Sequence, residues 1–149
     1  MWRAATSRTT SLRWRRRRDD DFGENLVSVA VEDVERDAAA EYECPSHGIA
    51  FSPSQRELWL ADGVKNRLHV FDAAVYPPAH LAVVALTAPP RWITFSLDGR
   101  YAYPSSGEIV DAASRRIVGA LEDEQGAPVR SEKMLEIDVA GGVPIRAGE

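Results

Sequence analysis

The chain has 149 residues, of which 44% are apolar and 28% charged, a composition ordinary for one globular domain with a buried core. No window holds the roughly 18 to 20 apolar residues that a membrane-spanning helix needs, so no transmembrane helix is predicted. A single cysteine cannot form a disulfide within the chain, so the fold does not depend on an oxidising compartment.

The net charge of −5 conceals an uneven distribution. Residues 1–18 contain seven arginines and no acidic residue, whereas the remainder carries eleven basic and twenty-three acidic residues. This remainder would repel phosphate groups, so nucleic-acid binding is expected only through the arginine-rich leader.

The basic leader, residues 1–24, has several interpretations. A secretory signal is excluded because no apolar run follows the arginines. The Arg/Ser/Thr-rich composition is compatible with an organelle transit peptide, and a nucleic-acid-binding arm is an equal alternative. A disordered or non-native leader is favoured over both.

After the leader, the chain consists mainly of short runs rich in Val, Leu, Ile, Phe and Trp, bounded by Gly, Pro, Asp or Asn. Such runs are typical of β-strands separated by turns. Residues 36–43 predict a short helical turn or an acidic linker instead. The predicted strands lie at 25–35, 47–53, 57–62, 67–72, 80–86, 91–96, 100–104, 108–112, 115–121, 134–139 and 143–146.

Eight of these strands form two copies of one unit, because Phe51-Ser52 recurs 44 residues later as Phe95-Ser96. A four-strand unit repeated at this spacing is the signature of a β-propeller blade. Strands that are apolar at every position, such as Leu58–Leu60, fit blades whose two faces are both buried. The other aligned positions are Arg56 with Arg100, Trp59 with Tyr103, Asp72-Ala73 with Asp111-Ala112, and Leu86 with Leu121.

The sequence therefore predicts an all-β fold, a partial β-propeller of about two four-stranded blades with extra strands and a disordered basic leader. Propellers close with about four to eight blades. The chain is thus expected to be the C-terminal piece of a larger propeller, or a protomer that closes by self-association. The expected divisions are the leader (1–24), a remnant strand and linker (25–43), two blades (44–90 and 91–130), and C-terminal strands that could close the ring (131–149).

The second copy carries a specific series of motifs: a strand ending Phe95-Ser96, an Asp98–Arg100 turn, an aromatic strand, and Ile109–Asp111. With the first copy, over about residues 44–121, it resembles the YVTN-type bacterial β-propeller repeats. Where the family has Tyr-Val-Thr-Asn, this chain has Tyr101–Pro104. Proline lacks the amide that a sheet ladder needs, so that strand is expected to end there or lie at an edge.

The resemblance implies a scaffold with a ligand or partner surface at one end of a central channel. We expect a non-catalytic binding or interaction protein whose ligand or partner is unknown and which needs no cofactor. The alternative is a fragment of a quinoprotein- or haem-linked oxidoreductase subunit or of a lactonase-like hydrolase, with an active site that needs further blades. Many family members are exported, which implies a periplasmic or secreted location, although the chain itself shows no signal peptide.

The candidate binding residues are those expected at the channel mouth: Cys44, His47, Gly48 and Trp92. His47 and Gly48 open the first strand of a blade, and Gly48 is expected to allow a tight turn into it. Cys44 and His47 have ligand spacing, but a stable zinc site needs three or four protein ligands. His69 and His80 are not expected to converge on such a site, so no metal is predicted.

The other residues with reactive, acidic or aromatic side chains are expected to have structural roles. Acidic neighbours tend to raise the pKa of the Cys44 thiol, so a cysteine nucleophile is not predicted. The aspartates at strand ends are expected to accept backbone hydrogen bonds in turns, and the large aromatics to pack in the core. These residues are Asp62, Asp72, Asp98 and Asp111, and Trp59, Trp92 and Tyr103.

Overall fold

The structure is a computed structural model that describes residues 11–15, 26–30 and 48–148. The described residues contain strands and no helix, which confirms the all-β prediction, and none of them forms a helix able to cross a membrane. The strands are β1 (Ser11–Arg15), β2 (Leu26–Ala30), β3 (Ile49–Phe51), β4 (Glu57–Asp62), β5 (Arg67–Asp72), β6 (Ala79–Ala85), β7 (Ile93–Phe95), β8 (Tyr101–Pro104), β9 (Glu108–Asp111), β10 (Arg116–Ala120), β11 (Glu136–Ala140) and β12 (Val143–Gly148).

Part of the predicted leader is a strand, which corrects the expectation of disorder over residues 1–24. β1 pairs antiparallel with β2, from Ser11 opposite Ala30 to Arg15 opposite Leu26. The sequence of β1, SLRWR, alternates apolar with polar residues, the period of a strand, and this pattern outweighs the high arginine content. The other leader residues lie outside the described part of the chain, as do residues 36–43.

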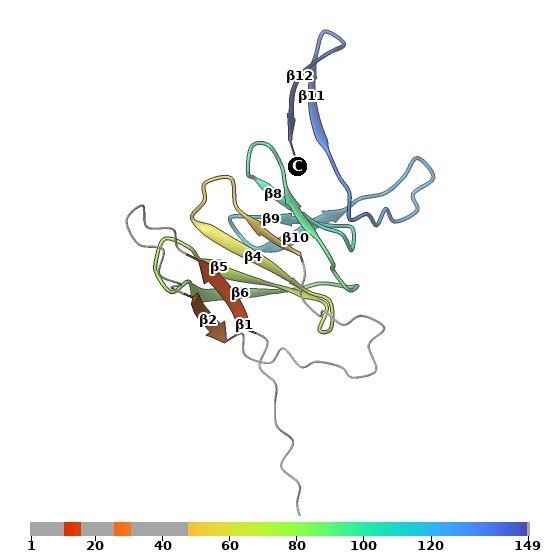
Figure 1. Cartoon of the computed structure of the whole chain (residues 1–149). Helices are drawn as coiled ribbons and strands as arrows, with labels where there is room; N and C mark the ends of the chain where they lie inside the picture. The colour runs from red at the N-terminus through yellow and green to blue at the C-terminus, as the bar shows by residue number, and fades with distance from the viewer. Residues whose placement is uncertain (1–10, 16–25, 31–47, 149) are drawn as a thin grey trace, which may run out of the picture.

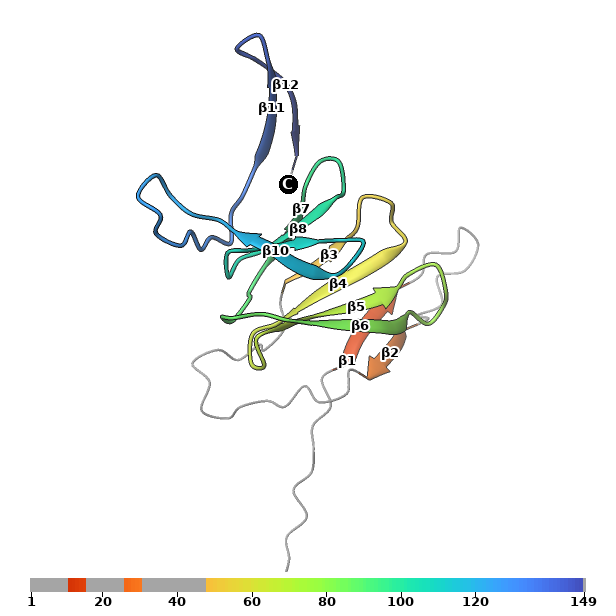
Figure 2. The ribbon, with the colours of Figure 1, turned by 180° about the vertical axis from the view of Figure 1, so that it is seen from behind.

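Strands β3–β6 and β7–β10 form two four-stranded antiparallel sheets in which each strand pairs with the next along the chain. The two sheets are visible from both sides of the molecule (Figures 1 and 2). β8 ends at Pro104, as expected from the missing amide of proline. The sheets do not close into a ring.

The 44-residue sequence repeat is also a repeat of hydrogen bonds. In the first sheet the Ser52 amide donates to the Glu57 carbonyl at 2.8 Å, and the Ser52 hydroxyl accepts from the Glu57 amide at 3.1 Å. In the second sheet Ser96 and Tyr101 make the same two bonds, each at 2.9 Å. The aligned turn residues also share a left-handed backbone: they are Gln55 and Gly99.

The ends of the two units match as well. The Leu86 amide donates to the Asn66 carbonyl, and the Leu121 amide donates to the Gly107 carbonyl, both at 2.7 Å. Both bonds join the end of the unit to the turn between its second and third strands. The aligned residues therefore occupy equivalent places in two copies of one supersecondary unit.

The hydrophobic core lies between the facing surfaces of the two sheets. Trp59 of the first sheet is fully buried. Its ring packs edge-on against the ring of Phe95 of the second sheet, and the two ring centroids are 5.4 Å apart. Such aromatic pairs stabilise beyond the burial of their surface. The buried members of this core are Trp59, Ala61, Leu68, Val70, Val84, Leu86, Ile93, Phe95, Ala102 and Val110.

An ionic connection joins the sheets beside this core. Arg115 in the turn between β9 and β10 donates to Glu57 Oε1 at 2.7 Å, and Trp59 Nε1 donates to Glu57 Oε2 at 2.9 Å. The carboxylate thus links the core tryptophan of one sheet to the edge of the other. This contact fixes how the two sheets are positioned against each other.

The C-terminal hairpin β11–β12 extends away from both sheets (Figures 1 and 2). Its turn uses Gly141 and Gly142, both with positive φ, as the Ala-Gly-Gly sequence predicts. At its base, Glu136 accepts a hydrogen bond from the Leu97 amide at 2.5 Å, and Arg146 donates to the Leu97 carbonyl. The hairpin is therefore held at the turn between β7 and β8.

Candidate functional site

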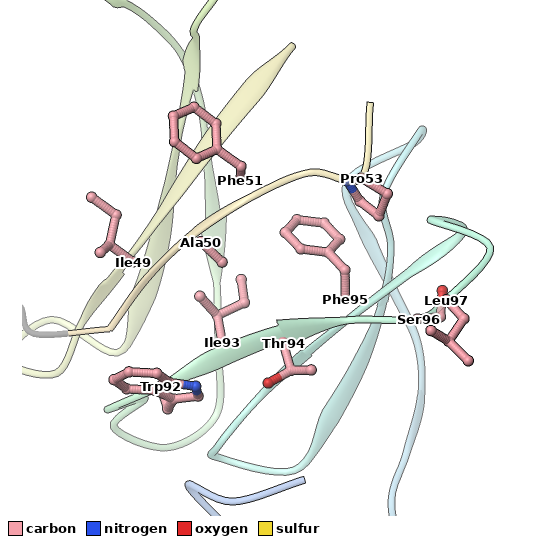
Figure 3. A pocket seen from close by; sticks show the side chains of 10 residues that line it. All are labelled: Ile49, Ala50, Phe51, Pro53, Trp92, Ile93, Thr94, Phe95, Ser96 and Leu97. Carbon is pink, nitrogen blue, oxygen red and sulfur yellow. The ribbon is translucent and has the colours of Figure 1, made fainter. Parts of the chain in front are cut away.

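A groove of about 390 Å³ runs between β3 and β7, the first strands of the two sheets. Ala50, Ile93 and Phe95 point into the space between the strands, whereas Ile49 and Phe51 point away from it (Figure 3). Apart from the Thr94 and Ser96 hydroxyls, its lining side chains are mainly apolar. The groove can therefore receive an apolar group.

Two of the four predicted binding residues, Gly48 and Trp92, meet at one end of this groove. A Cβ atom added to Gly48 would lie 2.7 Å from Trp92 Cα and 2.9 Å from the Arg91 carbonyl carbon. Gly48 does not have a positive φ, and its missing side chain allows the backbones of the two sheets to approach closely.

Trp92 borders the groove and is 37% exposed, so the expectation that it packs in the core is wrong, in contrast to Trp59. Its ring lies under Lys133, whose Nζ is 5.1 Å from the ring centroid. This cation–π contact was not predicted, because Lys133 is far along the chain in a segment without periodicity. The other two predicted residues, Cys44 and His47, lie outside the described residues.

A second constellation lies on the opposite face of the first sheet, where Asp62, His69 and His80 form a continuous chain. Asp62 Oδ2 is 3.4 Å from His69 Nε2, and His69 Nδ1 is 3.3 Å from His80 Nε2. Asp62 and His69 are buried, and His80 is exposed. The two histidines are therefore in contact with each other, whereas the expectation that they do not join Cys44 and His47 in a metal site falls on residues outside the described part of the chain.

A β-bulge explains this convergence. His69 pairs with Val83 and Val70 with Ala82, but Phe71 pairs with His80 because the register shifts between Val70 and Phe71. Without the shift, alternation along the strands would place His80 on the face opposite His69. Bulges commonly redirect a side chain in this way.

Asp62 is held by several donors at the end of β4. Its Oδ1 accepts from the amides of Val64 and Lys65, each at 3.1 Å, and its Oδ2 accepts from Arg67 Nε at 3.0 Å. Burial raises the pKa of Asp62, but the hydrogen bonds from His69, the Lys65 amide and Arg67 outweigh it, so the pKa lies below its usual value. Asp62 is therefore ionised at neutral pH.

All four strand-end aspartates accept backbone amide hydrogen bonds, which confirms their predicted role in turns. Asp72 accepts from the Ala74 amide at 2.8 Å and Asp98 from the Arg100 amide at 2.9 Å. Asp111 accepts from the Ser114 amide at 2.7 Å. Of these four aspartates, only Asp62 also contacts a histidine, and it is therefore the one that belongs to the Asp62–His69–His80 chain.

A second buried carboxylate, Glu108, fixes the segment between the sheets. Its Oε1 accepts from the Thr87 amide at 2.7 Å and from the Thr87 hydroxyl at 2.6 Å. Burial raises the pKa of Glu108, but the Ser106 and Thr87 hydroxyls and the Thr87 amide more than offset this effect, so its pKa is lowered. Glu108 is thus a structural anchor of the linker between the two sheets.

Because the folded pKa of Asp62 is depressed, its contribution to stability is present above the unfolded pKa and is lost as the pH falls through the folded pKa. We expect Asp62→Asn to lower the free energy of unfolding at pH 7, and this difference from wild type to shrink below about pH 4. Urea unfolding at pH 7, 4 and 3 measures it. Glu124→Gln, at an exposed site, is the control, and a constant difference for Asp62→Asn would contradict the prediction.

Within residues 48–148, no three His, Cys, Asp or Glu side chains lie together in a way that could hold a metal ion. Comparisons of the chain with protein-family models, curated proteins and solved structures each found no match.

Proposed function

We propose that the chain is an interaction scaffold, part of a β-propeller of the YVTN type, which binds a small apolar ligand in the groove between β3 and β7. The observation that carries this proposal is the repeated unit. Two equivalent four-stranded sheets pack face to face, with their first strands side by side. In a propeller the first strands of the blades border the central channel, and this is where the groove lies.

The chemistry of the groove favours a small, mostly apolar ligand. Its volume is in the range of small-molecule sites, about 300–1,000 Å³. Trp92 lines the groove and is 37% exposed, so it offers aromatic surface to a ligand. The ligand is therefore expected to carry an aromatic or aliphatic group.

The two sheets alone do not form a ring, and we propose that further copies of this chain complete it. The last strand of the second sheet, β10, and the C-terminal hairpin expose large apolar side chains: Val118 of β10 is 58% exposed and Ile145 of β12 is 66% exposed. Exposed apolar surface of this kind marks an interaction site. With two blades per copy, about two to four copies supply the four to eight blades of a propeller.

Filling the groove tests the ligand-binding part of the proposal. In Ala50→Leu the added atoms point into the groove, and we expect binding of the apolar probe 1-anilinonaphthalene-8-sulfonate there to weaken about tenfold or more, as a loss of about 1.4 kcal/mol would produce. Titration followed by NMR at the Trp92 indole reports on this site. Ala85→Leu, at an exposed position of β6, is the matched control.

Two results would contradict this part of the proposal. One is a probe that perturbs other residues and leaves the Trp92 indole resonance unchanged. The other is equal binding to Ala50→Leu and Ala85→Leu when both variants retain the folded spectrum.

A further inference from the structure

Asp62, His69 and His80 connect the interior of the first sheet to its surface through side-chain hydrogen bonds. The distances are 3.4 Å from Asp62 Oδ2 to His69 Nε2 and 3.3 Å from His69 Nδ1 to His80 Nε2. The inner two residues are at most 1% exposed, and the outer one faces the surface. The arrangement is a carboxylate–imidazole–imidazole chain with one accessible end.

The direction of the hydrogen bonds follows from the chemistry of the inner end. An ionised carboxylate only accepts, so His69 Nε2 must carry the hydrogen in the bond to Asp62. In neutral His69 the other nitrogen, Nδ1, is then an acceptor and takes the hydrogen of His80 Nε2. The buried pair therefore fixes the tautomer and ring orientation of His80.

This orientation gives His80 the properties of a general base. When its imidazole gains a proton, the positive charge is stabilised by the bond from Nε2–H to His69, which is itself held by the charged Asp62. In its neutral form, a hydrogen-bonded and exposed imidazole is suited to remove a proton from water. Arg67 also contacts Asp62 and keeps that carboxylate ionised.

The surroundings of His80 indicate the substrate class. The Phe71 ring lies 5.1 Å from the His80 ring, and Val83, on the same face as His69, is 46% exposed. Phe71 is fully buried, so the apolar surface on this face of β6 is that of Val83. It fits the acyl chain of an ester better than a phosphate or a polar sugar.

We propose that His80 is the general base of a hydrolytic site for apolar esters, and that His69 and Asp62 are its positioning residues. His80 takes a proton from a water molecule as the water oxygen bonds to the carbonyl carbon of the ester. The bond from that carbon to the alkoxy oxygen then breaks, and the alcohol leaves with the proton that His80 returns. Ester and water become acid and alcohol, and no other reactant is needed.

The bulge between β5 and β6 supports this proposal independently of the hydrogen bonds. It inserts one residue in β6 and turns His80 onto the face of His69 at the cost of a regular ladder. The buried Asp62 also forms an ion pair with Arg67, and apolar residues of similar volume often stabilise a core better than such a pair does. A catalytic role for His80 accounts for both the bulge and the buried ion pair.

The test uses the full chain and the chromogenic ester 4-nitrophenyl butyrate. Because any exposed imidazole hydrolyses such esters slowly, the control is His80→Gln/Ala85→His, which moves the imidazole to another exposed position on β6. We expect the wild-type rate to exceed that of this control by about 100-fold or more, the usual contribution of a positioned general base. His80→Gln is expected to fall to the rate of the control or below.

The positioning role of His69 has a readout that a structural role does not give. His69→Phe keeps a ring but removes the acceptor for His80, so we expect a lower rate. We also expect the acid-side limb of the pH–rate profile, on which protonation of the base removes activity, to shift to lower pH. His69→Gln, whose carbonyl can accept the same hydrogen, is expected to restore part of the rate and move the limb back. A Phe variant that loses rate with an unshifted profile would overturn the assignment of His69.

Equal rates for wild type and the relocated histidine, in proteins with the same thermal unfolding, would overturn the proposal as a whole. His80 is exposed, so its replacement is not expected to unfold the chain. The site lies on the face of the first sheet opposite the core, so its failure would leave the ligand groove between β3 and β7 unaffected.

Discussion

Replacing Trp59 with alanine is expected to lower the free energy of unfolding by about 3–5 kcal/mol, the range for truncating a large buried aromatic. Trp59 is fully buried, meets the Phe95 ring 5.4 Å away, and donates its indole hydrogen to Glu57. The substitution removes the centre of the contact between the sheets and leaves one oxygen of a half-buried carboxylate without that donor. Equilibrium urea unfolding measures the loss.

Trp92→Ala is the matched control because Trp92 is 37% exposed. It would lose mainly a partly exposed surface and the contact with Lys133, worth about 0.5–1 kcal/mol at exposed sites. The Trp59 variant should therefore be clearly the less stable of the two. Equal losses would show that the core does not lie between the two sheets.

Replacing Gly48 with alanine has the second largest expected effect on stability. The new Cβ would lie 2.7 Å from Trp92 Cα, and the atoms that it meets belong to the backbone at the start of β7. Backbone atoms cannot move aside as the end of a flexible side chain can, so we expect a loss of about 1–3 kcal/mol, the usual cost of overpacking. At a site where alanine fits without strain, replacing glycine with alanine instead raises the free energy of unfolding by about 0.4–1 kcal/mol.

Gly119→Ala on β10 provides that comparison. Its Cβ would meet only the Ile109 side chain, at an ordinary 3.6 Å, and its φ is not positive. Gly119→Ala is expected to be neutral or stabilising, and Gly48→Ala to be destabilising with weaker binding of the apolar probe. If both variants were equally stable, β3 and β7 would not approach as closely as described.

The sheets could be predicted from the sequence because their signals are local and repeated. Each strand from β3 to β10 lies in a short apolar run bounded by turn residues, such as Asp98-Gly99 before β8. The spacing of Phe51-Ser52 and Phe95-Ser96 also predicted that the two units are copies, and the same hydrogen bonds recur at Ser52 and Ser96. Strand β1 was missed because seven arginines near it dominate the composition.

The candidate site could be predicted only in part, because its residues meet through register and packing. Asp62 and His69 share a face by simple alternation across the β4–β5 hairpin, a signal that was present in the sequence. His80 joins them through a bulge, and no residue pattern in β6 indicates where that extra residue lies. The approach of Gly48 to Trp92 likewise depends on how the two sheets pack, which strand patterns do not specify.

Sedimentation velocity of the 149-residue chain tests the central claim, that its two sheets are blades of a ring completed by further copies. If the ring is completed in this way, the chain sediments as an assembly of about two to four copies. Val118→Asp and Ile145→Asp, which place charge on the exposed apolar surface, are expected to shift the chain toward the monomer. A monomer at every concentration, unfolding in one cooperative transition, would contradict it.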